Sequence, residues 1–284
     1  IKDAGHEVPN PASRKQLLMG VVVVAAIIVV MVVALATGAI QVDWLSNIVT
    51  AVALVAAIYL WAQMYTSKLV TREEKNRLLG FIPMFISGVL FFGIFQQQFT
   101  VMTIYADVRL DRHMFGWEIP PSLVQSINPI FIVIFSAIFA TMWTKLGNRQ
   151  WSTPVKFGVA NIVIGISLFF FLPYSGAAAN STPMYVIILI LFLFTMAELL
   201  LSPVGNALAT KVAPVAFPSR MMAVWMMAVA MGTSLAGSLA SFYNPDDAGA
   251  ENTFFISLGV VSIVLGAILL VLSRWVVKKF STFR

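Results

Sequence analysis

A single carboxylate, Glu198, lies in the otherwise apolar run FTMAELLLSPVG at positions 194–205. An ionised side chain near the centre of a membrane-spanning helix costs about 2.5–3.5 kcal/mol on insertion scales, so such a group normally faces a protein interior and has a partner or a function. Helical spacing places Ser202 one turn further along, on the same side of the helix. This pair predicts a site for a proton or for a ligand that carries positive charge.

The middles of the apolar stretches contain no basic residue that could pair with Glu198, because both histidines, His6 and His113, lie in polar segments. The partner is therefore expected to be a proton, a bound ligand, or a group outside this chain. A protonated glutamic acid that is hydrogen-bonded between helices is the structural alternative.

Amide side chains also lie deep in apolar stretches. The run FQQQFT carries Gln96 and Gln97, and QSINPIF places Asn128 next to Pro129. Pro129 and Pro203 each leave one helical carbonyl without its usual donor. Such a carbonyl is tolerated at membrane depth where it lines a cavity or where a neighbour pairs with it. We expect helices around a polar interior, with a packing kink as the alternative for either proline.

The composition identifies the surroundings of these residues as a membrane. Hydrophobic residues make up 60% of the chain, charged residues only 11%, and the mean hydropathy is +0.90, far from the values of an average soluble domain. The chain lacks the alternating pattern of a membrane barrel. Stretches of roughly 20 apolar residues predict an all-α protein with eight transmembrane helices, at about 16–38, 44–65, 78–105, 122–143, 157–174, 183–205, 221–243 and 254–275.

The basic residues predict the orientation. Eight spans place both chain ends and alternate connections on one side, and these segments carry 16 of the 18 Lys and Arg residues. By the positive-inside rule this side is cytoplasmic, so we expect a multi-pass plasma-membrane protein with both termini inside. Attraction to anionic lipids accounts for the basic balance, without nucleic acid as a partner. The chain has no cysteine, which excludes disulfides and thiolate chemistry.

The spans divide into two groups. Residues 1–77 contain two helices with almost nothing polar in their middles, which can face lipid on all sides, followed by the charged connector SKLVTREEKNR. Residues 78–284 contain six helices with buried polar groups and helix breakers. We expect a six-helix bundle with two accessory helices outside it. Because the chain begins at Ile1, we also expect it to be processed or to be a piece of a longer protein.

Several of these runs resemble one known family. TMAELLLSPVG resembles the tenth-helix motif GELLLSPVG of the proton-dependent oligopeptide transporters, which belong to the major facilitator superfamily. FFGIFQQQFTVMTIYADVRLDR, SLVQSINPIFIVIFSAIFATMW and RMMAVWMMAVAMG resemble the seventh, eighth and eleventh helices, in the expected order. The resemblance implies the carboxyl-terminal half of a bacterial proton-coupled di-/tripeptide symporter, with the accessory helix pair in front. The amino-terminal six-helix bundle is then a missing partner.

The resemblance also implies roles for individual residues. Glu198 matches the glutamate that engages the amino terminus of the peptide and can pair with a lysine of the missing half, and Asn128 matches an asparagine that binds the same ammonium. Ser202 would add a hydroxyl beside Glu198. Trp225 would form an apolar wall of a side-chain pocket, and its position near the start of its span makes an interfacial anchor the alternative.

One position departs from the family. Many members have a glutamate on the seventh helix where this chain has Gln96, and an amide cannot change its charge with pH. The proton-coupling and gating roles of that glutamate are therefore not carried over. Gln96 and Gln97 can still donate hydrogen bonds to a substrate, and coupling is expected to depend more on Glu198.

Other functions remain open. The same fold could carry nitrate or amino-acid derivatives, although Glu198 would repel an anion. An intramembrane enzyme would need a nucleophile and base or a metal cluster at depth, and the spans contain no His, Cys or Asp, so we expect no enzyme, no metal and no cofactor besides the proton as coupling ion. An isolated half could instead be a non-transporting fragment that forms a homodimer through its exposed polar wall.

Overall fold

The computed structural model of the protein describes residues 13–41, 44–114 and 116–280. Within them the chain is almost entirely helical. Short 3₁₀ turns extend several helices, and one two-stranded ribbon lies in a loop, formed by β1 (His113–Met114) and β2 (Trp117–Glu118). The helices are α1 (Arg14–Ala36), α2 (Leu45–Thr66), α3 (Arg72–Phe95), α4 (Val101–Val108), α5 (Pro121–Val124), α6 (Ile127–Leu146), α7 (Thr153–Leu168), α8 (Met184–Val212), α9 (Pro218–Ala240) and α10 (Ala248–Phe280).

The prediction of eight membrane spans is confirmed. Eight helical segments of the described chain are long and apolar enough to cross a membrane. The third, expected as one helix over 78–105, is interrupted by the 3₁₀ turn Gln96–Phe99 and continues as α4. Gln97 explains the break, because its Nε2 donates to the carbonyl oxygens of Gly93 at 3.1 Å and Ala236 at 3.2 Å. A side chain that pairs with backbone carbonyls competes with the regular helical ladder.

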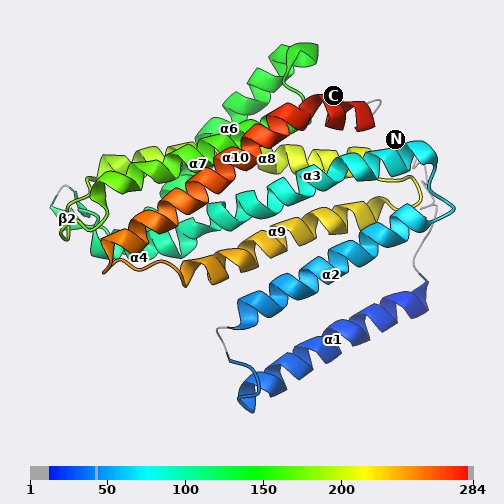
Figure 1. Cartoon of the computed structure of the whole chain (residues 1–284), viewed down its shortest axis with the longest axis horizontal. Helices are drawn as coiled ribbons and strands as arrows, with labels where there is room; N and C mark the ends of the chain where they lie inside the picture. The colour runs from blue at the N-terminus through cyan, green and yellow to red at the C-terminus, as the bar shows by residue number, and fades with distance from the viewer. Residues whose placement is uncertain (1–12, 42–43, 115, 281–284) are drawn as a thin grey trace.

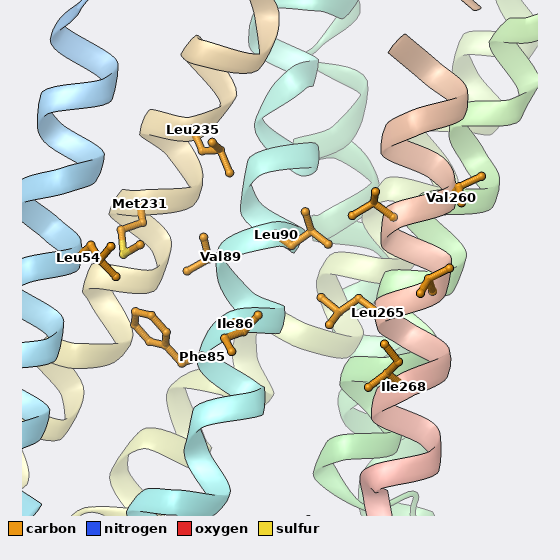
Figure 2. Close-up of a pocket in the computed structure, with 12 residues that line it drawn as sticks. Leu54, Phe85, Ile86, Val89, Leu90, Met231, Leu235, Val260, Leu265 and Ile268 are labelled. Atoms are coloured by element: carbon orange, nitrogen blue, oxygen red, sulfur yellow. The ribbon is translucent and has the colours of Figure 1, made fainter. Parts of the chain in front are cut away.

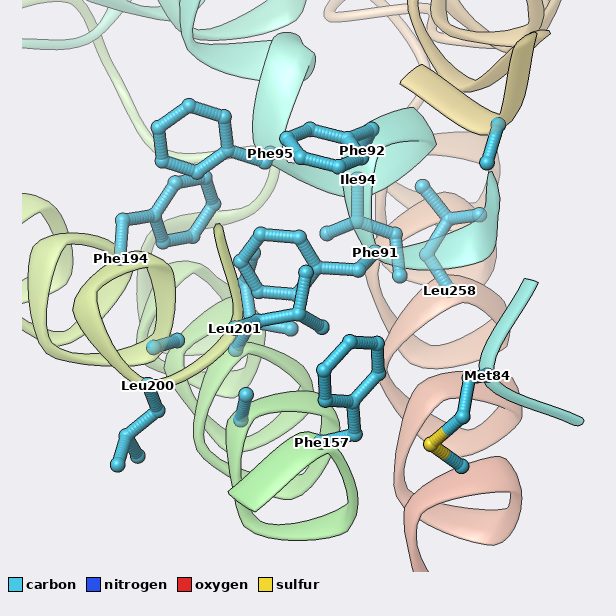
Figure 3. Packing of buried hydrophobic residues seen from close by; sticks show 14 of the residues in the cluster. Met84, Phe91, Phe92, Ile94, Phe95, Phe157, Phe194, Leu200, Leu201 and Leu258 are labelled. Atoms are coloured by element: carbon cyan, nitrogen blue, oxygen red, sulfur yellow. The ribbon is translucent and has the colours of Figure 1, made fainter. Parts of the chain in front are cut away.

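Helix α3 is the central element of the bundle. It contacts α7, α8, α9 and α10, while α7 packs along α10 and α6 packs on α8 (Figure 1). Lipid tails are as apolar as leucine, so the helices associate through close packing and hydrogen bonds rather than by escape from water. The packing is aromatic at the centre, where Phe91 stacks on Phe95 at 5.7 Å and Phe95 meets Phe194 of α8 at 6.1 Å between ring centroids (Figure 3).

Helices α7 and α10 approach closely through glycines. A Cβ atom on Gly165 would lie 2.7 Å from the carbonyl oxygen of Gly259, and one on Gly158 would lie 2.9 Å from that of Gly266. Non-bonded atoms at such short distances clash, so any larger residue at Gly158 or Gly165 would push the two helices apart. Small residues at these positions bring the two backbones together, as at other membrane helix crossings.

The accessory helices differ from each other. The most apolar window of α1 has no buried residue, and α1 lies at the outer edge of the molecule (Figure 1). The expectation that α2 also faces lipid on all sides is wrong, because α2 packs on α9 and buries Ala53, Ala57 and Met64. The hydroxyl of Ser234 on α9 donates to the carbonyl oxygen of Ser46 at 2.6 Å. The division of the chain at residue 77 stays a prediction.

Candidate functional site

Glu198 lies in the middle of α8 and is half-buried. Its Oε2 atom is enclosed and has no hydrogen-bond partner among the described residues, and the side chain of Asn128 on α6 interacts with its carboxyl group. A buried acceptor left unpaired costs about 1–3 kcal/mol. Native proteins rarely keep such a group without a ligand, a water or a functional use. The role of Glu198 toward a ligand stays a prediction.

Asn128 connects two helices at this site. It is 3% exposed and is the only buried residue of α6, and its Nδ2 donates to the hydroxyl of Thr195 on α8 at 2.9 Å. Thr195 in turn donates to the carbonyl oxygen of Leu191 at 2.8 Å. This chain of hydrogen bonds orients the asparagine amide one turn before Glu198. Asn128, Thr195 and Glu198 form what we call the α6–α8 site.

The sequence interpretation did not include Thr195. The available signal was its spacing, because Thr195 precedes Glu198 by three residues and Ser202 by seven, which places all three on one side of a helix. Ser202 is half-buried one turn beyond Glu198, as the spacing predicts. Its role toward a ligand stays a prediction.

The expected free carbonyl before Pro129 is not found. The backbone N–H of Asn128 donates to the carbonyl oxygen of Gln125 at 3.3 Å, so a tightened turn satisfies the acceptor that the proline ring leaves. The proline therefore shapes the start of α6 and places Asn128, rather than presenting a backbone acceptor to the interior.

The glutamines form a separate group between α3 and α9. Gln96 is half-buried, and its Nε2 donates to the hydroxyl of Thr233 at 3.1 Å. The donors of Gln97 point to carbonyls inside the bundle, and its Oε1 accepts from the Thr100 hydroxyl at 3.0 Å. Gln98 is 1% exposed, and neither polar atom of its side chain has a partner among the described residues. Gln98 is thus a further candidate that the sequence interpretation left out.

Trp225 lies inside the bundle. It is 1% exposed, its Nε1 donates to Asn206 Oδ1 at 2.9 Å, and its ring packs against Gly88 and Gly205. A Cβ atom on Gly205 would lie 2.1 Å from the ring, so that glycine is required for the indole to fit. The alternative interpretation of Trp225 as an interfacial anchor is wrong, because its ring is buried against α3, α7 and α8. Its role in a side-chain pocket stays a prediction.

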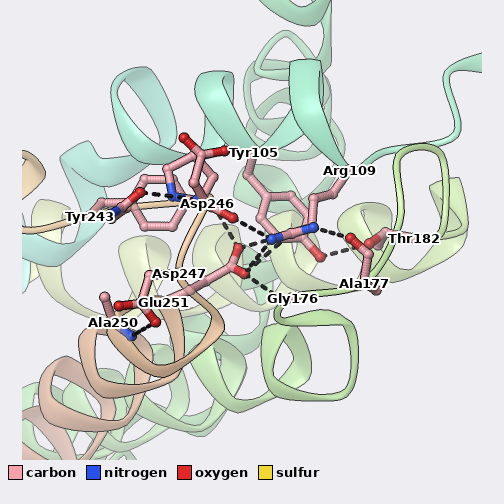
Figure 4. Close-up of polar contacts among 12 residues, drawn as sticks. Tyr105, Arg109, Gly176, Ala177, Thr182, Tyr243, Asp246, Asp247, Ala250 and Glu251 are labelled. Atoms are coloured by element: carbon pink, nitrogen blue, oxygen red, sulfur yellow. Dashed lines mark hydrogen bonds and ion pairs between the residues drawn. The ribbon is translucent and has the colours of Figure 1, made fainter.

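A second buried polar cluster lies at the end of the bundle where α4 ends and α10 begins (Figure 4). We call this cluster the outer network. Arg109 is 5% exposed and Glu251 is fully buried. Their charged groups meet at 3.0 Å, and the carboxylate also accepts from the Tyr243 hydroxyl and from the Gly176 N–H, both at 2.9 Å. The Tyr105 hydroxyl pairs nearby with Thr182 at 2.7 Å.

The outer network joins the segment after α4, the start of α10 and the loop before α8. Burial raises the pKa of the Tyr243 hydroxyl, and the Glu251 carboxylate beside it raises the pKa further, so this tyrosine stays a hydrogen-bond donor. The pairing of Arg109 with Glu251 was not predicted from the sequence. The network has all the features of a structural ion pair, with both charges hydrogen-bonded.

Comparison with known proteins decides the family. The POT family model matches residues 8–256, which is most of the chain. The chain belongs to the POT family. Among relatives of this POT-family chain, an uncharacterized transporter YclF of Bacillus subtilis (strain 168) is 37% identical over 95% of this chain and 54% of its own length. A di-/tripeptide transporter of Lactococcus lactis subsp. cremoris is 33% identical over 99% of this chain and 58% of its own length.

Solved structures of the POT family share the fold. A crystal structure of a peptide transporter POT in complex with sulfate matches with a TM-score of 0.82 at 32% identity, covering 97% of this chain and 56% of the other. A POT family transporter in complex with 5-aminolevulinic acid matches with a TM-score of 0.80 at 35% identity, covering 94% and 56%. This POT-family chain is a multi-pass membrane protein that spans about half the length of the relatives it matches.

Proposed function

We propose that this chain supplies one wall of a peptide site in a proton-coupled symporter of di- and tripeptides. The observation that carries the proposal concerns Glu198, at the middle of a membrane-spanning helix and beside Asn128: its Oε2 has no hydrogen-bond partner within the described residues. The amino terminus of a peptide provides an ammonium group that would pair with this carboxylate. Asn128 donates through Nδ2 to Thr195, and its amide oxygen remains an acceptor for the same ammonium.

The exposed surface of α6 supports the proposal that a second group of helices forms the other wall of the peptide site. Asn128 is its only buried residue, and large apolar side chains such as Val133 (76% exposed) and Ile130 (58% exposed) are uncovered. We propose that a second six-helix bundle, the amino-terminal half of the same protein, packs against this helix. Rocking of two bundles around a midplane site is the usual mechanism of such transporters. Alternatively, two copies of an isolated half would form a homodimer that buries the same surface of α6.

Proton coupling is proposed to involve Glu198. A carboxyl group can pair with an ammonium when it is ionised and releases it when it is protonated, so loading and protonation compete at the same atoms. Gln96 cannot take part in this exchange, since it is an amide that bonds to Thr233. Both termini are proposed to lie in the cytoplasm, in the plasma membrane, on the side that holds most of the basic residues.

The test is uptake by the full-length protein in proteoliposomes with an inward proton gradient. Dialanine uptake is expected in the wild type and is expected to be lost in Glu198→Gln, with normal insertion and folding. Glu118→Gln is the matched control, because Glu118 is exposed in the loop ribbon and pairs only with Arg112. Dialanine uptake that is unchanged in Glu198→Gln would show that the glutamate is a protonated, structural residue.

A second candidate substrate class is supported by one of the related structures. The transporter solved with 5-aminolevulinic acid is 35% identical to this chain, and that ligand carries an amine, like a peptide. An amino-acid derivative with a free amine would use the same Glu198 carboxylate. Competition of dialanine uptake by 5-aminolevulinic acid and by nitrate separates the two: inhibition by the amine alone supports a site selective for ammonium groups, whereas inhibition by nitrate contradicts the role given to Glu198.

A further inference from the structure

An apolar groove runs along α3, with α2 and α9 on one side and α10 on the other (Figure 2). It has a volume of about 550 Å³ near the middle of these helices, and a pocket of about 350 Å³ continues it toward the start of α3. The two share Leu54, Phe85 and Ile86, and we call them together the α3 groove. All its lining side chains are apolar except for the indole of Trp61, whose N–H donates a hydrogen bond to the carbonyl oxygen of Leu78.

The length of the α3 groove matches one leaflet of a bilayer. On α3 the lining runs from Phe81 to Leu90, which is about 14 Å at 1.5 Å per residue. Half the hydrocarbon thickness of a bilayer is about 15 Å. The groove therefore has the length of an acyl chain that enters at the start of α3 and ends at the midplane.

Basic residues extend the groove at that end. Lys75 lies 7 and 11 residues before Ile82 and Ile86, and Lys279 lies 11 residues after Ile268. Separations of 7 and 11 return to the same face of a helix. Both lysines thus lie on the helix faces that line the groove, about two to three turns beyond its apolar part.

The surroundings of the two lysines suit a lipid headgroup. Lys279 Nζ donates to Asn76 Oδ1 at 3.3 Å, which places it beside the start of α3. Lys75 Nζ lies 5.8 Å from the ring of Tyr65, which stacks on Trp61 of the groove, and Lys279 lies 5.7 Å from that of Trp275. Aromatic side chains with basic neighbours are typical of the membrane interface.

The two lysines at this end, Lys75 and Lys279, have no carboxylate partner in the part of the chain that the structure describes. The nearby Glu74 instead caps α3 and accepts from the N–H of Val215 at 2.8 Å. A ligand with one negative group next to a long apolar chain complements both parts of the surface.

We propose that the α3 groove binds one acyl chain of an anionic glycerophospholipid, with the lipid phosphate held by Lys75 and Lys279. Such a lipid would fill the space between the accessory helix α2 and the six-helix bundle. The α3 groove is lined by none of the residues of the α6–α8 site, so lipid binding can be tested independently of peptide transport.

The test is lipid retention by the full-length protein, measured by native mass spectrometry in detergent. Phosphatidylglycerol and phosphatidylcholine with identical acyl chains are titrated separately, and inorganic phosphate is added in a third arm. The variants are Lys75→Gln/Lys279→Gln, which removes the charge, and Ile86→Trp or Val264→Phe, which fill the groove from α3 or α10. Lys145→Gln/Lys211→Gln is the control, because these lysines lie in the last turns of α6 and α8, which do not line the groove.

The protein is expected to bind phosphatidylglycerol in preference to phosphatidylcholine. Its affinity for phosphatidylglycerol is expected to fall about tenfold or more in the double lysine variant, since each basic residue contributes to attraction of an anionic lipid. The groove-filling variants are expected to lose the lipid with both lysines intact, and the control to keep it. Equal binding of the two lipids, equal loss in the control, or lysine-dependent binding of inorganic phosphate that displaces the lipid would each overturn the proposal. A lipid-free dimer that covers the groove would also overturn it.

Unchanged elution and an unchanged melting temperature identify the variants that remain folded. Because the two groove-filling variants are independent, lipid binding can still be tested if one of them fails to fold.

Discussion

Asn128 on α6 donates its side-chain amide to the hydroxyl of Thr195 on α8 at 2.9 Å, one turn before Glu198. This hydrogen bond is a direct polar link between the helix that carries the acid and the helix that carries the amide. The geometry of the α6–α8 site therefore depends on a residue that does not need to touch a ligand.

Replacement of Thr195 is predicted to weaken substrate binding. Thr195→Val keeps the shape of the side chain but leaves the buried Asn128 donor unpaired, at a cost of about 1–3 kcal/mol. The expected result is a KM for dialanine raised by about tenfold, because a difference of about 1.4 kcal/mol corresponds to that factor. Thr195→Ser should restore wild-type KM.

Thr210→Val is the control for this position. Its hydroxyl bonds only to carbonyls of its own helix, at the exposed end of α8. A KM that stays at the wild-type value in Thr195→Val would show that Asn128 does not need the threonine for its orientation.

The glycine contact between α7 and α10 predicts a stability effect. The Cβ atom of Gly165→Ala would lie 2.7 Å from the carbonyl oxygen of Gly259 and 2.8 Å from Ile263 Cγ1. Overpacking of this kind costs about 1–3 kcal/mol. The melting temperature of the purified protein is expected to fall, and Gly20→Ala, where a Cβ meets nothing within 4 Å, is expected to leave it unchanged. Equal melting temperatures in both variants would contradict the close helix packing.

The outer network predicts a larger loss of stability than the glycine contact does. Glu251→Gln removes the charge opposite the buried Arg109, and breaking a buried ion pair on one side costs about 3–5 kcal/mol. Thermal unfolding is expected at a markedly lower temperature. The exposed pair between Arg112 and Glu118 is the comparison, because removal of a surface pair changes stability by about 0–1 kcal/mol. Similar losses in Glu251→Gln and Glu118→Gln would mean that the outer network is not the stabilising element proposed.

Single cysteine substitutions test the orientation, because the sequence in hand contains no cysteine of its own. The full-length protein without either substitution gives the background labelling. Val215 is 73% exposed in the loop after α8, and Asp246 is exposed in the loop before α10. With both termini in the cytoplasm, Asp246→Cys is expected to react with a membrane-impermeant maleimide in intact cells, and Val215→Cys only after the membrane is opened. The reverse pattern of labelling would invert the topology.

The sequence alone was sufficient for the eight spans and for Glu198 as the central candidate. Both follow from local properties, because a helix needs about 20 apolar residues to cross hydrocarbon and a lone carboxylate within such a run is conspicuous. The resemblance of TMAELLLSPVG and three other runs to one transporter family was equally local, and the family match confirms it.

Contacts between distant segments required the tertiary structure. Asn128 pairs with Thr195, Trp225 is buried against Gly205, and Arg109 pairs with Glu251. These residues are 20 to 142 positions apart in the sequence, and helical periodicity does not predict which faces meet. The same holds for the α3 groove, whose walls come from four helices. Hydropathy determines that a segment enters the membrane, whereas side-chain packing and hydrogen bonding between helices determine what each segment faces once it is there.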